Sequence, residues 1–487
     1  MVLQTENPHL VLFPLMAQGH IIPMMDIARI LAQRGAIVTI FTTPKNASRF
    51  NSVISRAVSS GLKIRLVQLR FPSKEAGLPE GSENLDMVTS KEMSKFFLVI
   101  HMFQKPAEEL FEALTPKPSC IISDFCLPWT AQLAEKYHIP RISFHGFSCF
   151  CLHCRYMIET SKVCESITSE SKYFTIPGIP DKIQVTKEQL PGSITDNLED
   201  FKVVMRAAEM KSYGFIINTF EELEKEYVRD YKKARNNKVW CIGPVSLCNK
   251  DALDKAQRGN QASINEHLCL KWLDLQQPKS VVYVCFGSIC NLISSQLVEL
   301  ALALEDTKRP FLWAIREGGQ FQELEKWICE EGFEERMKGR SLIIRGWAPQ
   351  VIILSHPSIG GFFTHCGWNS TLEGISAGLP LVTWPLFGDQ FLNEKLVTQV
   401  LKIGVSVGVE VPVQWGDEER RGVLVKKDDI KRAIWMVMDD DGEEGKERRE
   451  RVSKLSEMAK IAVEEGGSSH LDITLLIQDI MQQSTTI

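Results

Sequence analysis

The sequence predicts an α/β protein with two facing domains, each built on a parallel sheet with helices on both sides. The chain has 487 residues, which is too long for one ordinary hydrophobic core. Two series of short apolar runs alternate with helical patterns, and a polar stretch near residue 250 separates them. Ligands bind beyond the carboxyl ends of parallel strands, so we expect a binding site between the two domains.

The first series begins with the apolar run His9–Leu15, which we predict to be a strand. A turn that contains glycine follows, and then a helical pattern with Pro23 near its start. The β-branched run Ile37–Thr42 completes a strand–helix–strand unit of the parallel type. Further strands of this half are predicted at 64–69, 120–123, 141–144 and 214–218.

The second series follows Asn249–His267, a charged stretch without hydrophobic period that we interpret as a linker or surface loop. It opens with the predicted strand Val281–Phe286, a tight turn at 287–288 and a helix whose N-cap is Ser294 or Ser295. Later strands are predicted at 311–315, 342–344, 359–364 and 381–384.

These patterns divide the chain into four segments. Residues 1–247 are predicted to form the first domain, 248–270 a linker, and 271–467 the second domain. The segment 468–487 has helical period and is expected to pack back on the first domain.

Composition and charge exclude several classes of protein. The net charge of −5 is small for this length, and no basic run marks a nucleic-acid surface, so we expect no nucleic-acid partner. The first residues lack a basic segment followed by a long apolar core, which argues against a signal peptide. No apolar run approaches the ~20 residues that span a bilayer. We therefore expect a monomeric cytoplasmic protein without a transmembrane segment.

The 13 cysteines are odd in number and scattered over the chain, which is typical of free thiols in a reducing compartment. One group could be interpreted as a zinc site, namely His145, Cys149, Cys151, His153 and Cys154. It lacks a second pair of closely spaced cysteines and lies in an apolar segment. We prefer core packing for these residues and expect no metal.

The stretch from Trp347 to Gln390 combines features of a nucleotide site. A predicted strand ends at His365, and Gly367 allows a tight turn into a helix that runs to Ala377, for which Asn369 and Ser370 are good caps. The start of a helix attracts anions because its N–H groups are free and its dipole is positive there.

Three other side chains of this stretch suit the rest of a nucleotide. Glu373 lies one turn after Asn369; its carboxylate would repel a phosphate but suits two ribose hydroxyls. Trp347 precedes a proline-containing loop, where the indole could cover a base. Gln350 could bind the base edge with both a donor and an acceptor.

The whole stretch Trp347–Gln390 resembles the nucleotide-sugar box of plant family 1 UDP-glycosyltransferases. Segments such as FPSKEAGLPEG, SDFCLP and VEEGGSSH resemble the group D subfamily, and the likeness extends over nearly the full chain. The resemblance implies two Rossmann-like domains in the GT-B arrangement. It implies that the first domain binds an acceptor and the second a UDP-sugar, which is the co-substrate.

The resemblance also implies roles for single residues. Trp347 is expected to stack on uracil, Glu373 to hold the ribose, and His365 to contact the diphosphate. A terminal Gln390 goes with glucose in this family. The implied donor-binding set is Ser288, Trp347, Ala348, Gln350, His365, Gly367, Trp368, Asn369, Ser370, Glu373, Asp389 and Gln390.

Two residues of the first half suit acid–base chemistry. His20 follows the first predicted strand, and its ordinary pKa near 6.5 suits a base at neutral pH. Asp124 closes the strand-like run CIISD, and a carboxylate there can orient the imidazole. The resemblance implies that His20 is the catalytic base and Asp124 its partner. We expect direct displacement at the sugar C1, with inversion to a β-glycoside and without a metal or other cofactor.

The acceptor pocket is predicted at Gly19, Phe125, Trp129, Phe147 and Phe150, which provide aromatic and apolar surface near the dyad. The resemblance to group D implies a triterpenoid or steroid aglycone or a flavonoid as acceptor. We therefore expect glucose transfer from UDP-glucose to a hydroxyl of such a lipophilic plant metabolite.

Several alternatives differ from this prediction in the sugar, the acceptor or the presence of chemistry. Another UDP-sugar (galactose, xylose or glucuronate), a hormone acceptor, and a binding protein without chemistry stay open, although the intact dyad argues against the last. The absence of any G-x-G triplet and of GxxxxGK argues against a dehydrogenase and a P-loop kinase.

Overall fold

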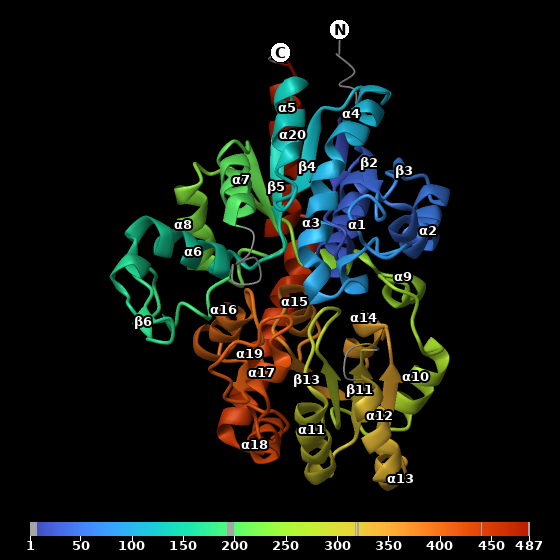
Figure 1. The fold of residues 1–487 in the computed structure, drawn as a ribbon, viewed down its shortest axis with the longest axis vertical. Coiled ribbons are helices and arrows are strands. Elements are labelled where there is room, and N and C mark those ends of the chain that lie inside the picture. The colour runs from blue at the N-terminus through green and yellow to red at the C-terminus, as the bar shows by residue number, and fades with distance from the viewer. Residues whose placement is uncertain (1–6, 192–198, 317, 319–320, 440, 486–487) are drawn as a thin grey trace.

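The computed structural model describes residues 7–191, 199–316, 318, 321–439 and 441–485. The outer ends of the first and last predicted segments, 1–6 and 486–487, lie outside the described residues. Two α/β domains lie one above the other in Figure 1, with the N-terminal domain at the top. The prediction of an α/β protein with two parallel-sheet domains is confirmed.

The N-terminal sheet has seven strands, all parallel, in the order β3-β2-β1-β4-β5-β8-β9. Its central strands are apolar and wholly buried, as expected when helices cover both faces. The strands are β1 (His9–Phe13), β2 (Ile37–Thr42), β3 (Ile64–Gln68), β4 (Cys120–Asp124), β5 (Arg141–His145), β8 (Gly214–Ile217) and β9 (Val239–Cys241).

The helices of this domain follow the strands in alternation. They are α1 (Gln18–Gln33), α2 (Pro44–Ser59), α3 (Met93–Met102), α4 (Gln104–Glu112), α5 (Trp129–Lys136), α6 (Cys149–Ser161), α7 (Glu199–Met210) and α8 (Lys225–Ala234). A small antiparallel pair, β6 (Phe174–Thr175) and β7 (Gln184–Val185), lies between α6 and α7 in the sequence.

The C-terminal sheet has six parallel strands in the order β12-β11-β10-β13-β14-β15. In each sheet the order of the strands reverses between the first strand and the fourth, which are β1 and β4 in one sheet and β10 and β13 in the other. Open α/β sheets bind ligands at such a switch point. The strands are β10 (Val281–Cys285), β11 (Phe311–Ile315), β12 (Ser341–Arg345), β13 (Ile359–Thr364), β14 (Leu381–Thr383) and β15 (Gly404–Ser406).

The helices after residue 290 surround this second sheet, and the last one leaves it. They are α11 (Ser294–Thr307), α12 (Phe321–Glu330), α13 (Phe333–Arg336), α14 (Gln350–Leu354), α15 (Trp368–Ser376), α16 (Gln390–Lys395), α17 (Glu418–Arg421), α18 (Lys427–Val437), α19 (Glu443–Val463) and α20 (Ser468–Thr485).

The segment between the sheets is more ordered than its polar composition predicts. It contains α9 (Ala252–Ala256) and α10 (Glu266–Asp274), and several of its polar side chains are buried. Asp254 accepts from Arg29 of α1 at 2.5 Å and from Arg56 of α2 at 2.7 Å. The predicted linker or surface loop is therefore held against the N-terminal domain, which supplies the partners that make burial of Asp254 possible.

Helix α20 returns to the N-terminal domain, where it runs beside the sheet in red in Figure 1. Its side chains Ile473, Leu476 and Ile480 join the core of that domain. Lys238, just before β9, pairs with Asp479 at 2.7 Å and adds a polar contact.

Two predicted helix caps are wrong. Helix α11 has Ile293 as its N-cap, so Ser294 is its first residue. Helix α15 has Gly367 as its N-cap, so Asn369 and Ser370 lie within its first turn. In both cases the extended backbone that defines an N-cap lies earlier than the polar side chains suggest.

The cysteine–histidine group lies in the core. All 13 cysteines are free, and Cys149, Cys151 and Cys154 are fully buried. Across the described ranges, no cluster of three or more His, Cys, Asp or Glu side chains could hold a metal ion. A search of the same ranges for a helix long and apolar enough to cross a membrane also finds none.

Candidate active site at the domain interface

His20 and Asp124 meet at the switch point of the N-terminal sheet. His20 lies in the first turn of α1, which follows β1, and Asp124 ends the adjacent strand β4. The imidazole Nδ1 lies 2.6 Å from Oδ2 of Asp124, and the other carboxylate oxygen accepts the N–H of Cys126 at 2.9 Å. A carboxylate only accepts, so Nδ1 carries the proton, and Nε2 is the nitrogen available as a base.

The surroundings of His20 make it more basic than an ordinary histidine. Burial by itself would lower its pKa, but the charge and hydrogen bond of Asp124 outweigh burial, and the pKa of His20 is raised above 6.5. The imidazole side chain is 24% exposed and lines the cavity, whereas Asp124 is fully buried behind it.

This pKa shift has a measurable consequence for the pH profile. A base must be neutral, so activity should fall as the pH drops through the pKa of His20, which lies above 6.5. In Asp124→Asn the raising charge is lost, so the acidic limb of the kcat/KM profile should move to lower pH while kcat falls. A limb that stays in place would contradict the coupling of the two residues.

The C-terminal wall of the site is formed around His365, at the switch point of the second sheet. Gly287, with φ 75°, and Gly367 both lie against its imidazole, and a Cβ on Gly287 would lie 2.7 Å from the ring. Burial lowers the pKa of His365 to about 4, so the ring is neutral at neutral pH and can donate one hydrogen bond. Ser288 lies beside it, on the cavity.

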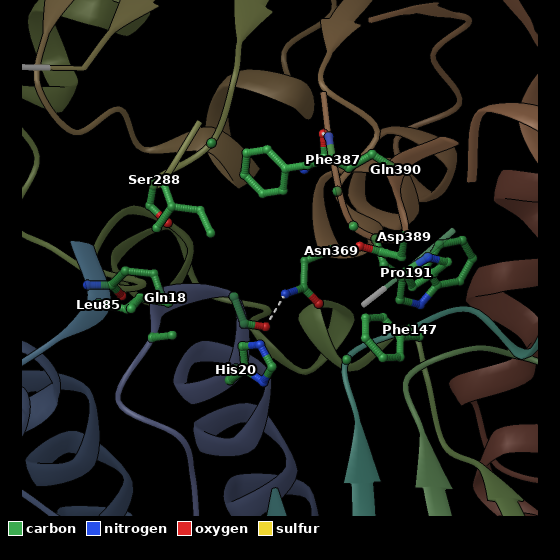
Figure 2. Close-up of a pocket in the computed structure, with 18 of the residues that line it drawn as sticks. Gln18, His20, Leu85, Phe147, Pro191, Ser288, Asn369, Phe387, Asp389 and Gln390 are labelled. Carbon is green, nitrogen blue, oxygen red and sulfur yellow. Dashed lines mark hydrogen bonds between the residues drawn. The ribbon is translucent and has the colours of Figure 1, made fainter. Parts of the chain in front are cut away.

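The start of α15 contacts the N-terminal domain through Asn369. Pro23 of α1 has no N–H, so the carbonyl of Gly19, four residues earlier, lacks a helical partner. Asn369 Nδ2 donates to this carbonyl at 2.6 Å, which is the dashed line in Figure 2. Trp368 is buried and donates from Nε1 to the carbonyl of Asn218 at 2.7 Å. Trp368 and Asn369, which were predicted to bind the UDP-sugar, therefore connect the two domains.

Glu373 lies in the cavity wall but already has partners. Gln350 Nε2 donates to its carboxylate at 2.8 Å and to Ser370 Oγ at 3.1 Å. Arg258, which the sequence interpretation missed, also pairs with Glu373. Its other contact is Asp26 of α1 at 2.7 Å, and the side chains of all three charged residues are less than 10% exposed. No local pattern marks Arg258, since its partners lie more than 100 residues away in the sequence.

Trp347 and Ala348 form the edge of the site next to the linker segment. The indole of Trp347 is half-buried and packs against Gly259, where φ is 99° and a Cβ would lie 2.5 Å from the ring. The N–H of Trp347 donates to Ser263 Oγ at 2.9 Å. The linker segment thus fixes the position of the predicted base-stacking residue.

Asp389 and Gln390 face the cavity from the start of α16, and Figure 2 shows them on the wall opposite His20. Burial raises the pKa of Asp389 to about 6, and Asn393 donates to its carboxylate at 2.6 Å. The side-chain carbonyl of Gln390 accepts the N–H groups of Leu386 and Phe387. Its Nε2 donates to Cys290 Sγ at 3.7 Å, so the second N–H of Nε2 is the part that can contact a ligand.

One cavity of about 1580 Å³ connects these groups. All twelve predicted donor residues line it, together with His20 and three of the five predicted acceptor residues, which are Gly19, Phe125 and Phe147. The other two do not. Trp129 is 3% exposed and packs edge-on against Phe13, and Phe150 is fully buried against Tyr227. Both belong to helices whose apolar side faces the core.

The two facing parallel-sheet domains, with a base–carboxylate pair on one side and a helix start on the other, define a glycosyltransferase of the GT-B arrangement. Two family models match the chain: "Glycosyltransferase, N-terminal domain" over 6–247 and "UDP-glucoronosyl and UDP-glucosyl transferase" over 257–414. UDP-glycosyltransferase 73C2 of Arabidopsis thaliana is 56% identical over 98% of this chain and 96% of its own. The chain belongs to the plant family 1 UDP-glycosyltransferases.

Solved structures are similar over almost the whole chain. Glycyrrhiza uralensis UGT73P12, complexed with glycyrrhetinic acid 3-O-monoglucuronide, has a TM-score of 0.88 at 37% identity and covers 99% of this chain and 97% of its own. Arabidopsis thaliana UGT89C1, complexed with UDP-L-rhamnose, has a TM-score of 0.75 at 30% identity, over 98% and 99% of the two chains. The protein is therefore a UDP-sugar glycosyltransferase that acts on small plant metabolites.

Proposed function

We propose that this enzyme transfers glucose from UDP-glucose to a hydroxyl of a lipophilic plant metabolite, a triterpenoid or steroid aglycone or a flavonoid, and forms a β-O-glucoside. The observation that carries the proposal is one cavity, lined on one side by His20 with Asp124 behind it. The twelve predicted UDP-sugar-binding residues line its other side, which we call the donor wall. We further propose that the enzyme acts as a monomer in the cytoplasm.

In the proposed reaction His20 is the general base. Its Nε2 takes the proton of the acceptor hydroxyl as the oxygen attacks C1 of the sugar. The C1–O bond to UDP breaks on the opposite face, so a single displacement inverts the α-linked sugar to a β-glycoside. The proton ends on Nε2, and Asp124 stabilises the imidazolium through its bond to Nδ1.

The leaving UDP carries the charge that the donor wall would stabilise. Helix α15 begins at Trp368, and its N-cap Gly367 has no side chain to bind the first N–H groups, so these are free to bind phosphate oxygens. Neutral His365 and Ser288 provide further donors nearby. We propose that these groups make the reaction independent of a divalent metal.

The sugar and the acceptor are proposed from the chemistry of the lining. Gln390 ends the donor box and offers its amide group to a sugar hydroxyl, which supports glucose. Leu15, Leu85, Phe97 and Phe125 give the acceptor half an apolar wall. The Glycyrrhiza neighbour was solved with a triterpenoid glucuronide, and the Arabidopsis neighbour was also solved with quercetin, a flavonoid.

The test is incubation with UDP-glucose, UDP-galactose, UDP-xylose and UDP-glucuronate against a panel of hydroxylated aglycones, with and without a chelator. We expect a mass gain of one hexose from UDP-glucose, a large C1 proton coupling that marks the β anomer, and the same rate after chelation. Transfer of another sugar, or a rate that chelation abolishes and metal restores, would contradict the corresponding part of the proposal.

A further inference from the structure

A positively charged side chain that forms no ion pair with any residue that the structure describes faces the acceptor half of the cavity. It is Arg155 of α6. The helix presents one face to the cavity, with the spacing of three and four residues expected for a helical face: Leu152, Arg155, Tyr156, Glu159 and Thr160. The guanidinium lies 5.7 Å from the ring centroid of Phe147, and this contact is cation–π in geometry.

The other charges of this wall are paired with one another. Arg206 pairs with Glu159 at 3.4 Å, and Arg235 pairs with Glu209 at 3.1 Å. Throughout the part of the chain that the structure describes, Arg155 has neither an ion pair nor a side-chain hydrogen bond. Three guanidinium groups thus face two carboxylates of α6 and α7. Asp389 of the C-terminal domain is near enough for Arg155 to lower its pKa, but the two side chains form no ion pair.

The neighbouring histidine does not alter this balance. His145 stacks on Phe125, with ring centroids 5.0 Å apart, and burial lowers its pKa to about 4, so it is neutral at neutral pH. Burial would raise the pKa of Glu209, but His145, Arg235 and Arg155 together lower it, so this carboxylate is ionised and is already included in the balance.

A chain of aromatic contacts leads from this charge to the reacting centre. The ring centroids of His20 and Phe125 are 6.1 Å apart, those of Phe125 and Phe147 are 5.4 Å apart, and Arg155 lies over Phe147. Figure 2 shows Phe147 and His20 facing the same space. A rigid polycyclic acceptor that lies along these rings would place its hydroxyl at His20 and its far end at Arg155.

We propose that Arg155 binds a carboxylate carried by the acceptor at the end remote from the attacked hydroxyl. The proposal rests on the glycosyltransferase function proposed above and specifies the acceptor of the same site. A guanidinium offers a planar pair of donors that matches a carboxylate, and the half-buried position strengthens the pairing. The carboxylate has two possible sources, an acidic aglycone or a uronic acid sugar already attached to the aglycone.

The test compares matched acidic and neutral acceptors. Glycyrrhetinic acid and its methyl ester differ only in the carboxylate of the aglycone. The monoglucuronide and monoglucoside of the methyl ester differ only in the carboxylate of the sugar. Both kcat/KM and the Kd for each compound, measured by calorimetry on the UDP-loaded enzyme, are determined for wild type, Arg155→Met and Arg155→Lys. Arg432→Gln is the matched control, because that guanidinium pairs with Asp429 on the exposed side of α18 and does not line the cavity.

Wild type should prefer the acid of at least one pair, and the pair that shows the preference identifies the source of the carboxylate. Arg155→Met should reduce the acid-to-neutral ratio about 10–100-fold, mainly through KM and Kd. Arg155→Lys should recover part of it, and Arg432→Gln should keep the wild-type ratio. An equal loss on both members of a pair, or no preference in wild type by either measurement, would overturn the proposal. Failure of the glycosyltransferase function itself would appear differently, as no transfer to any acceptor.

Discussion

Replacing His20 with alanine should lower kcat by about 10²–10⁴-fold, the range that a positioned general base contributes. The imidazole is hydrogen-bonded to the buried carboxylate of Asp124 at the switch point of the N-terminal sheet, and it lines the cavity. Alanine leaves no group there to accept the proton of the attacking hydroxyl. The measurement is the initial rate at saturating UDP-glucose and acceptor.

Binding separates loss of chemistry from loss of structure. His20 lies in α1, whereas the proposed phosphate-binding groups lie in the other domain, so the Kd for UDP should change less than about 3-fold. His267→Ala, on the exposed side of α10, is the control for removal of an imidazole and should keep the wild-type rate. Retained turnover in His20→Ala would refute the assignment of the base.

Replacing Arg258 with methionine should destabilise the protein by about 3–5 kcal/mol, which corresponds to a fall in Tm of roughly 6–20 °C. The guanidinium joins Asp26 of the N-terminal domain to Glu373 of the C-terminal domain, and each side chain is less than 10% exposed. Its removal leaves two buried carboxylates without their shared cation. Thermal unfolding of the full-length enzyme without nucleotide measures the effect.

Two further variants make this result specific. Arg56→Met removes another arginine that contacts the linker segment, but Arg56 is 35% exposed and its partner Asp254 keeps Arg29, so we expect less than about 1 kcal/mol. Adding Asp26→Asn to Arg258→Met removes one of the two orphaned charges and should recover part of the Tm. Equal effects for Arg258→Met and Arg56→Met would contradict a special role for the interdomain pair.

The strands could be predicted from the sequence because their signal is local. Ile37–Thr42, Phe311–Ile315 and Ile359–Thr364 have the bounds that their apolar and β-branched runs indicate. The three-residue edge strands β9 and β15 were missed, because so few residues show no period. The N-caps of α11 and α15 were predicted too late in the sequence for a related reason. The N-cap is the residue with the extended backbone, and the presence of polar residues nearby does not show which residue that is.

The site residues that could be predicted are those whose place in the fold follows from the predicted strand before them. His365 directly follows β13, and His20 lies in the first turn of the helix after β1, so strand prediction places both at the cavity. Arg258 and Arg155 could not be found in this way, because their importance depends on which charges face them in space. Trp129 and Phe150 were predicted to line the acceptor pocket, but both are buried in the core. An aromatic residue close to Asp124 in the sequence can point away from the cavity.

The chain passes between the domains twice, once through α9 and α10 at the right of Figure 1 and once on the way into α20 near its centre. Two bodies tethered at two separate points keep rotation about the line through those points and lose most other relative movements. We therefore expect substrates to enter and products to leave by a rotation of the domains about one axis. The Asn369–Gly19 and Arg258 contacts lie across the interface between the domains, so we expect their loss to ease this rotation.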